Sequence, residues 1–118
     1  MVNKDGKIVA PVAASFQAAA ANADWKSVPG YGVILSDQPG AESWPMTAAT
    51  FILIHKQPKD AASAGEALKF FAWAYKNGSK AAEDLDYIAM PAGVVTDVET
   101  SWGEIKDASG KPIYAASH

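Results

Sequence analysis

The sequence predicts a helix-rich α/β fold with a few short strands, within a chain of 118 residues. Two segments indicate this mixture: residues 61–77 have apolar side chains at helical spacing, and residues 50–55 form a short, continuous β-branched and apolar run. The composition, 49% hydrophobic and 19% charged, is typical of a chain that folds. A chain of this length makes one domain at most, with one core of modest size.

The N-terminal quarter predicts one Ala-rich helix between turns. Residues 3–7 are a polar turn, and the apolar pair at positions 8 and 9 makes at most an edge strand. Pro11 suits the first turn of a helix, which we place at residues 12–21. Trp25 follows this helix, and we expect it to pack back on it.

Two strands are expected in the middle of the chain. Residues 31–35 follow a turn and are rich in aromatic and β-branched residues. Residues 38–45 contain two Pro and a Gly, which favours a loop. Residues 50–55 give the strongest strand signal, and because their apolar run is continuous, we expect both faces to be covered.

The best predicted helix spans residues 61–77. Its apolar face consists of Leu68, Phe71, Ala72 and Tyr75. Trp73 lies outside this stripe, so the helix has more apolar surface than one neighbour can cover. Asp60 is the expected N-cap, and Gly78 is expected to end the helix in a left-handed conformation.

Two shorter helices are expected after it. Residues 79–85 predict a helix capped by Ser79 and supported by a Lys80 to Asp84 ion pair. Pro91 opens the next helix, whose buried side is expected to be Val94, Val95, Val98 and Trp102, extended by Ile105. A turn at residues 107–112 then leads to a short strand at 113–114, and residues 115–118 are expected to fray.

Charge and cysteine content exclude several classes of protein. The net charge is −3 and all ten basic residues are Lys, so the clustered basic surface needed for nucleic acid is absent. Without Cys there is no disulfide framework and no thiolate metal site, although this leaves the cellular compartment open. No apolar run approaches the roughly 18 residues of a membrane span, and the first residues do not predict a secretory signal peptide.

The residue types that carry catalysis do not form a recognisable pattern. The two histidines, His55 and His118, have no metal-ligand spacing around them, and a structural or solvent-exposed role is favoured for His55. Asp84 and Asp86 could hold a hard cation, but a solvated helix end is the favoured interpretation. No nucleophile stands in a known motif beside a base. We therefore expect no catalytic residue, no metal and no cofactor, hence no enzyme.

The four tryptophans offer an alternative, since indole rings can stack on sugars or bases. Core packing is favoured for Trp25, Trp73 and Trp102, because they lie on or beside apolar helix faces. Trp44 lies in a loop rich in Pro and Gly, where it either holds the loop in place or marks a contact surface.

Four separated blocks, taken together, resemble one family. They are residues 44–56 (WPMTAATFILIHK), 67–78 (ALKFFAWAYKNG), 84–87 (DLDY) and 105–112 (IKDASGKP). In type, order and spacing they are similar to the C-terminal third of the periplasmic phosphate-binding protein of the bacterial high-affinity ABC phosphate importer. The resemblance extends over essentially the whole chain.

The resemblance implies a partial two-lobed periplasmic binding-protein fold of type II. Residues 1–118 would form a single C-terminal fragment, the end of the second lobe and the C-terminal part of the first. The family's phosphate ligands are hydroxyls, backbone amides, one Asp and one Arg from earlier in the family's chain. No residue of this chain is therefore expected to bind phosphate, which agrees with the absence of Arg. Location in the periplasm and an ABC permease partner are implied for the full-length protein.

Two functional hypotheses follow. In the first, the chain is a fragment of a phosphate-binding protein that serves phosphate uptake and itself lacks the phosphate ligands. In the second, it is a self-associating structural fragment with no retained ligand function. Residues 51–54 and the broad apolar face of residues 61–77 need neighbours, so we expect the isolated chain to form a homo-oligomer by intertwining or domain swapping.

Overall fold

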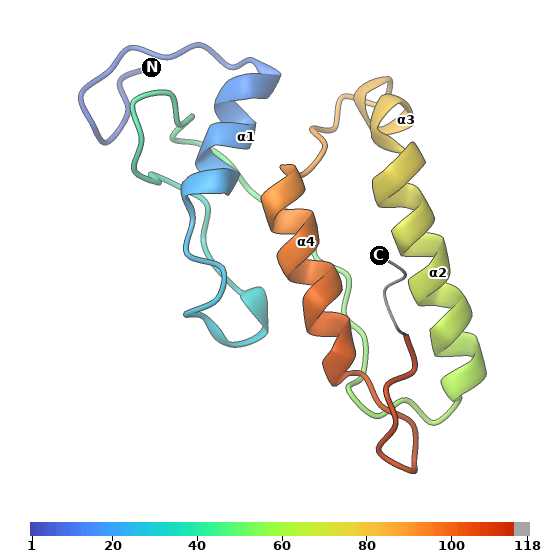
Figure 1. Cartoon of the computed structure of the whole chain (residues 1–118). Coiled ribbons are helices and arrows are strands. Elements are labelled where there is room, and N and C mark those ends of the chain that lie inside the picture. The colour runs from blue at the N-terminus through green and yellow to red at the C-terminus, as the bar shows by residue number, and fades with distance from the viewer. Residues whose placement is uncertain (115–118) are drawn as a thin grey trace. The chain divides into compact units, whose positions relative to one another are not determined.

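The computed structural model describes residues 1–114, which are mainly helices and loops. The elements are α1 (Ala13–Asn22), the 3₁₀ turn η1 (Pro29–Tyr31), α2 (Ala61–Asn77), α3 (Ser79–Glu83), α4 (Ala92–Ser101) and the 3₁₀ turn η2 (Trp102–Glu104) (Figure 1). The chain divides into two compact units, one of Met1–Thr50 with Ile88–Val94 and the other of Phe51–Tyr87 with Val95–His118. The predicted helix-rich character is confirmed.

The first unit is organised around α1. This helix begins after Val12, whose amide donates to the Ser15 Oγ at 3.2 Å, so a first-turn hydroxyl replaces a conventional N-cap side chain. The Trp25 indole is only 6% exposed, and its Nε1 donates to the Ala20 carbonyl at 2.7 Å. The prediction that Trp25 packs back on this helix is confirmed.

The loops of the first unit are held together by a buried asparagine. The side-chain amide of Asn3 donates to the carbonyl oxygens of Gly40 (3.0 Å), Ala41 (2.9 Å) and Ser43 (3.3 Å). Its Oδ1 accepts from the amides of Asp5 and Lys7. Asn3 is 6% exposed, so these bonds satisfy groups that water does not readily reach.

The second unit has its core between α2 and the residues that follow α4. Leu68, Trp102 and Ile105 form the buried centre. The partly buried residues packed around it are Ile54, Phe71, Ala72, Val98, Ile113 and Tyr114. As predicted, Asp60 is the N-cap of α2, and its carboxylate accepts from the Ser63 amide at 3.0 Å.

The junction between α2 and α3 differs from the prediction. Gly78 has φ −90° and ψ −5°, which is right-handed, so the expected left-handed C-cap is wrong. Gly78 and not Ser79 is the N-cap of α3. A Cβ at position 78 would lie 2.6 Å from the Ala74 carbonyl oxygen, so glycine is needed for close approach rather than for a positive φ. The predicted ion pair between Lys80 and Asp84 is present at 2.9 Å.

The predicted strands do not form. The described residues contain no strand, and their sheet-like pairing is limited to two isolated antiparallel bridges, Val2 with Ile8 and Lys106 with Pro112. Residues 31–35 cannot start as a strand because Tyr31 has φ +59°, within the left-handed region. Residues 50–55 have the composition of a strand, but the described residues provide no strand that pairs with them, and a strand exists only through its partner. Near residues 113–114 the pairing is limited to the Lys106–Pro112 bridge and the bond from the Ile113 amide to the Ile105 carbonyl, which is too short for a strand. Residues 115–118, expected to fray, lie outside the described residues.

Candidate functional site

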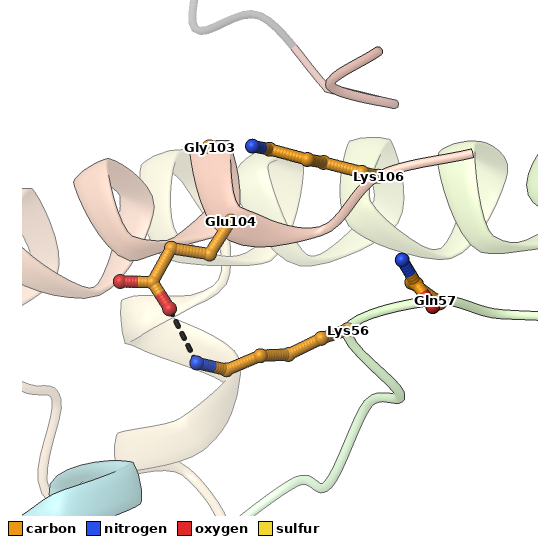
Figure 2. Close-up of a pocket in the computed structure, with 5 residues that line it drawn as sticks. All are labelled: Lys56, Gln57, Gly103, Glu104 and Lys106. Carbon is orange, nitrogen blue, oxygen red and sulfur yellow. Dashed lines mark hydrogen bonds and ion pairs between the residues drawn. The ribbon is translucent and has the colours of Figure 1, made fainter. Parts of the chain in front are cut away.

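An open pocket of about 500 Å³ lies in the second unit (Figure 2). Its lining residues are Lys56, Gln57, Gly103, Glu104 and Lys106. They come from two segments: one follows the predicted strand at residues 50–55, and the other is η2 with the residue pair after it.

A buried isoleucine joins these two segments. Ile105 is 7% exposed, and its neighbours Glu104 and Lys106 are both exposed. The Lys106 amide donates to the Lys56 carbonyl at 2.8 Å, which fixes the distance between the two sides of the pocket. The Ile113 amide in turn donates to the Ile105 carbonyl at 3.0 Å. The pocket is therefore positioned by the core of this unit.

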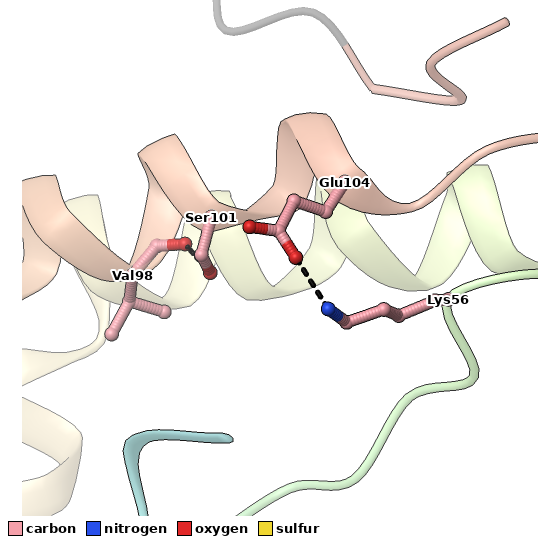
Figure 3. Close-up of polar contacts among 4 residues, drawn as sticks. All are labelled: Lys56, Val98, Ser101 and Glu104. Atoms are coloured by element: carbon pink, nitrogen blue, oxygen red, sulfur yellow. Dashed lines mark hydrogen bonds and ion pairs between the residues drawn. The ribbon is translucent and has the colours of Figure 1, made fainter. Parts of the chain in front are cut away.

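One ion pair dominates the electrostatics of the pocket. Lys56 and Glu104 point toward one another, and the Lys56 Nζ lies 2.5 Å from the Glu104 Oε2 (Figures 2 and 3). The hydrogen bond and charge of Lys56, with a smaller effect of Lys106, hold the pKa of the Glu104 carboxyl below its usual value. The two side chains are 76% and 64% exposed, so solvent screens the pair and it contributes little to stability.

The end of α4 beside this pair is capped from within. The Ser101 Oγ donates to the Val98 carbonyl at 2.6 Å (Figure 3). This bond satisfies a carbonyl in the last turn of α4, where the chain passes into η2.

The pocket has weak capacity for an anion. Lys56 already has a carboxylate partner, whereas Lys106 and Gln57 are exposed donors at the rim. An anion bound away from water needs several buried donors aimed at it. Throughout residues 1–114, every buried side-chain nitrogen and oxygen already has a hydrogen-bond partner. The pocket therefore resembles a solvated surface depression more than a preorganised binding site.

The other candidate residues are dispersed. His55 is exposed, and His118 lies outside the described residues. Asp84 is paired with Lys80 at the end of α3. The described part of the chain contains no group of three or more His, Cys, Asp or Glu side chains that could hold a metal ion. It also contains no helix that is long and apolar enough to cross a membrane.

The tryptophans partly contradict the sequence prediction. Trp25 and Trp102 are buried, as expected, at 6% and 7% exposure. Trp73 is 57% exposed, so its assignment to the core is wrong; it stacks instead on Phe70, with ring centroids 6.2 Å apart. The sequence did contain a sign of this exposure: the apolar surface of α2 is too wide for one neighbouring element to cover, and Trp73 lies outside its main apolar stripe. Trp44 is 8% exposed and lies 6.0 Å from the Phe16 ring, which shows that it holds its loop against α1.

Comparisons with known proteins identify the kind of molecule to which the chain corresponds. No protein-family model matches it. Curated relatives do match, but the chain spans only about a third of their length, so it corresponds to a segment of a larger protein. These relatives are named phosphate-binding protein PstS, and the chain is homologous to them.

The similarity covers nearly the whole chain. A PstS of Pasteurella multocida is 45% identical over 113 residues, which is 95% of this chain and 33% of the relative. PstS proteins of Xylella fastidiosa and Haemophilus influenzae are 42% and 43% identical over 100 residues, which is 85% of the chain and 28% and 30% of the relatives. The resemblance predicted from the sequence is confirmed.

Proposed function

We propose that this chain is a non-enzymatic part of a phosphate receptor that binds inorganic phosphate in the periplasm and delivers it to an ABC permease. The observation that carries the proposal is the homology to PstS over 95% of the chain at 45% identity. Binding of phosphate, the permease partner and the location all belong to the full-length protein, of which this chain corresponds to about a third.

The phosphate ligands lie in the other two thirds of that protein. The absence of Arg supports this, since Arg provides the planar pair of donors that best holds a phosphate. The pocket at Lys56 and Lys106 also supports it, because its charged groups are solvated and one is already neutralised by Glu104. The chain then contributes framework and not ligand contacts.

The two compact units correspond to two lobes of the receptor. The unit that contains residues 1–50 would form the end of the second lobe, and the unit that contains α2 and α3 would form the C-terminal part of the first. The division of the chain at residues 50 and 51 supports this assignment.

The second candidate function is a self-associating structural fragment. Large apolar side chains that are more than half exposed in the second unit favour it: Ile52, Leu53, Phe70, Trp73, Leu85 and Tyr87. Such surface is unusual for a monomer and indicates a contact surface. In the full-length receptor the rest of the protein would cover part of it, whereas an isolated chain would cover it with another copy.

Calorimetric titration with phosphate tests the proposed function. The chain alone is expected to bind no phosphate. A chimera in which the chain replaces the homologous third of the Pasteurella multocida PstS is expected to bind one phosphate per molecule, and the remaining two thirds without the chain is the control. A folded chimera that does not bind phosphate overturns the proposed function. Submicromolar binding by the chain alone overturns the location of the ligands.

A further inference from the structure

Asn77 and Gly78 form the junction at which α2 passes into α3 (Figure 1). The chain contains three asparagines, and Asn77 is the one that glycine follows, whereas Asn3 precedes a lysine and Asn22 an alanine. An asparagine side chain cyclises onto the next backbone amide most readily before glycine, because glycine has no Cβ to obstruct the approach. The residue pair most susceptible to this reaction therefore lies at a helix junction.

Two hydrogen bonds hold the reacting groups of this pair in the last turn of α2. The Gly78 amide donates to the Ala74 carbonyl at 2.7 Å. The Asn77 Nδ2 donates to the Trp73 carbonyl at 3.1 Å. The backbone nitrogen that would attack and the side-chain amide that would leave are therefore both bound to the preceding turn.

The helical backbone of Asn77 also keeps the two groups apart. Asn77 is the last residue of α2, and helical residues have ψ of about −42°. Closure of a succinimide ring requires the Gly78 nitrogen and the Asn77 Cβ to eclipse one another about the Cα–C bond of Asn77, and a helical ψ does not allow this. The ring can therefore close only after the last turn of α2 opens.

The junction has few restraints of its own against such opening. Gly78 is the N-cap of α3 and has no side chain with which to cap it, and α3 spans only Ser79–Glu83. A helix of this length is not stable by itself. Helix ends open locally at a much lower free energy than the whole domain unfolds. The hydrogen bonds of Asn77 and Gly78 are therefore expected to break transiently while the core of the unit stays folded.

We propose that Asn77 is a modification site, at which the chain deamidates spontaneously at a rate set by the opening of the last turn of α2. In the open turn the Gly78 nitrogen attacks the Asn77 Cγ. The bond between these two atoms forms, the bond from Cγ to Nδ2 breaks, and the Gly78 amide proton leaves with the NH₂ group as ammonia. Water then opens the succinimide at either carbonyl, which gives aspartate or isoaspartate at position 77.

Both products disturb the junction at which they form. Each places a carboxylate in the last turn of α2, where the helix dipole is negative. Isoaspartate also adds one carbon to the backbone, at a point where a Cβ on Gly78 would already lie 2.6 Å from the Ala74 carbonyl oxygen. The isoaspartate form is therefore expected to lose the hydrogen bond from Gly78 to Ala74.

Peptide mapping by mass spectrometry after incubation of the purified chain tests the inference, with the same incubation in guanidinium chloride as the unfolded reference. Conversion of Asn77 is expected to be at least about tenfold slower in buffer than in denaturant, because the closed turn protects it. In denaturant, Asn77 is expected to convert faster than Asn3 and Asn22, with isoaspartate among its products. Equal rates in buffer and denaturant, or conversion without isoaspartate, overturn the inference.

Ala74→Gly tests whether local opening sets the rate. Glycine is less favourable than alanine within a helix, so this change beside Asn77 is expected to speed conversion in buffer about fivefold and to have no effect in denaturant. Ala64→Gly is the matched control, because it makes the same change at a residue that is also partly buried, in the first turn of α2. If both variants convert at the same rate in buffer, global unfolding releases Asn77 and the inference is wrong. The experiment uses no phosphate, so its outcome is independent of the proposed function.

Discussion

Truncation of Leu68 tests the core on which the second unit depends. Leu68 is 0% exposed and packs against Trp102 and Ile105. Leu→Ala at buried sites costs about 2–5 kcal/mol, and we expect about 3 kcal/mol here, because the helix and the aromatic ring beside Leu68 cannot close the cavity fully. With a slope of about 1.5 kcal/mol per molar urea, the unfolding midpoint falls by about 2 M.

Urea unfolding followed by tryptophan fluorescence measures this shift, since Trp102 lies in the same core. Leu53→Ala is the matched control: the side chain is identical but 91% exposed, so at about 1 μM protein its cost is expected to stay below about 0.5 kcal/mol. If Leu68→Ala costs no more than Leu53→Ala, the assignment of the core is refuted.

Three further predictions concern local features. Asn3→Ala removes the side-chain donor to the buried Ser43 carbonyl and to the less buried carbonyls of Gly40 and Ala41, and is expected to cost about 2–3 kcal/mol in urea unfolding. Gly78→Ala is expected to destabilise the chain because its Cβ would meet the Ala74 carbonyl oxygen at 2.6 Å, whereas Gly93→Ala in α4, with no atom within 4 Å, is expected to stabilise it by about 0.5 kcal/mol. Hydrogen bonds from the first turn of α2 hold the pKa of the Asp60 carboxyl below its usual value, so its stabilising effect is full above about pH 4 and is lost as the pH falls through the folded-state pKa.

These predictions are checked by measurements that separate cause from general disruption. For Asn3, equal stability of the Ala variant and the unmodified chain would show that water replaces the side-chain amide. For the glycines, a higher melting temperature for Gly78→Ala than for Gly93→Ala contradicts the close contact. Asp60→Asn is expected to flatten the acid limb of the melting temperature against pH, and an unchanged limb rules out this carboxyl as a source of acid sensitivity.

The helices could be predicted from the sequence because their signals are local. α2 has the predicted bounds, Ala61–Asn77, since an N-cap aspartate and an apolar stripe act within a few residues of one another. α4 begins directly after Pro91, and this start was also indicated locally, because proline is favoured at the beginning of a helix. The exception at Gly78 is also local: the residue type indicated a helix end, but not whether glycine provides a positive φ or room for a carbonyl.

The strands could not be predicted, because strand formation depends on residues distant in sequence. Residues 50–55 have the composition of a covered strand, yet Leu53 is 91% exposed. The sequence predicted that both faces of this strand would be covered. Instead, the apolar side chains of Phe51, Ile52 and Leu53 are exposed in the described part of the chain. Trp73 shows the same effect, since an apolar residue on a broad helix face has no core to join unless a neighbour packs on that side.

The candidate pocket was missed from the sequence for a related reason. Lys56 and Glu104 lie 2.5 Å apart but are separated by 48 residues, and nothing in the spacing of either residue indicates the other. The similarity to PstS, in contrast, could be predicted from four blocks of sequence, because it depends on the type and order of residues along the chain and not on which residues are in contact.

Phosphate titration of the chimera with the Pasteurella multocida PstS tests the central claim most directly. If the chain is the framework third of a phosphate receptor, the chimera binds one phosphate per molecule, and neither the chain alone nor the remaining two thirds alone does so. A correctly folded chimera that binds no phosphate, with the unmodified Pasteurella protein binding in the same experiment, contradicts the claim.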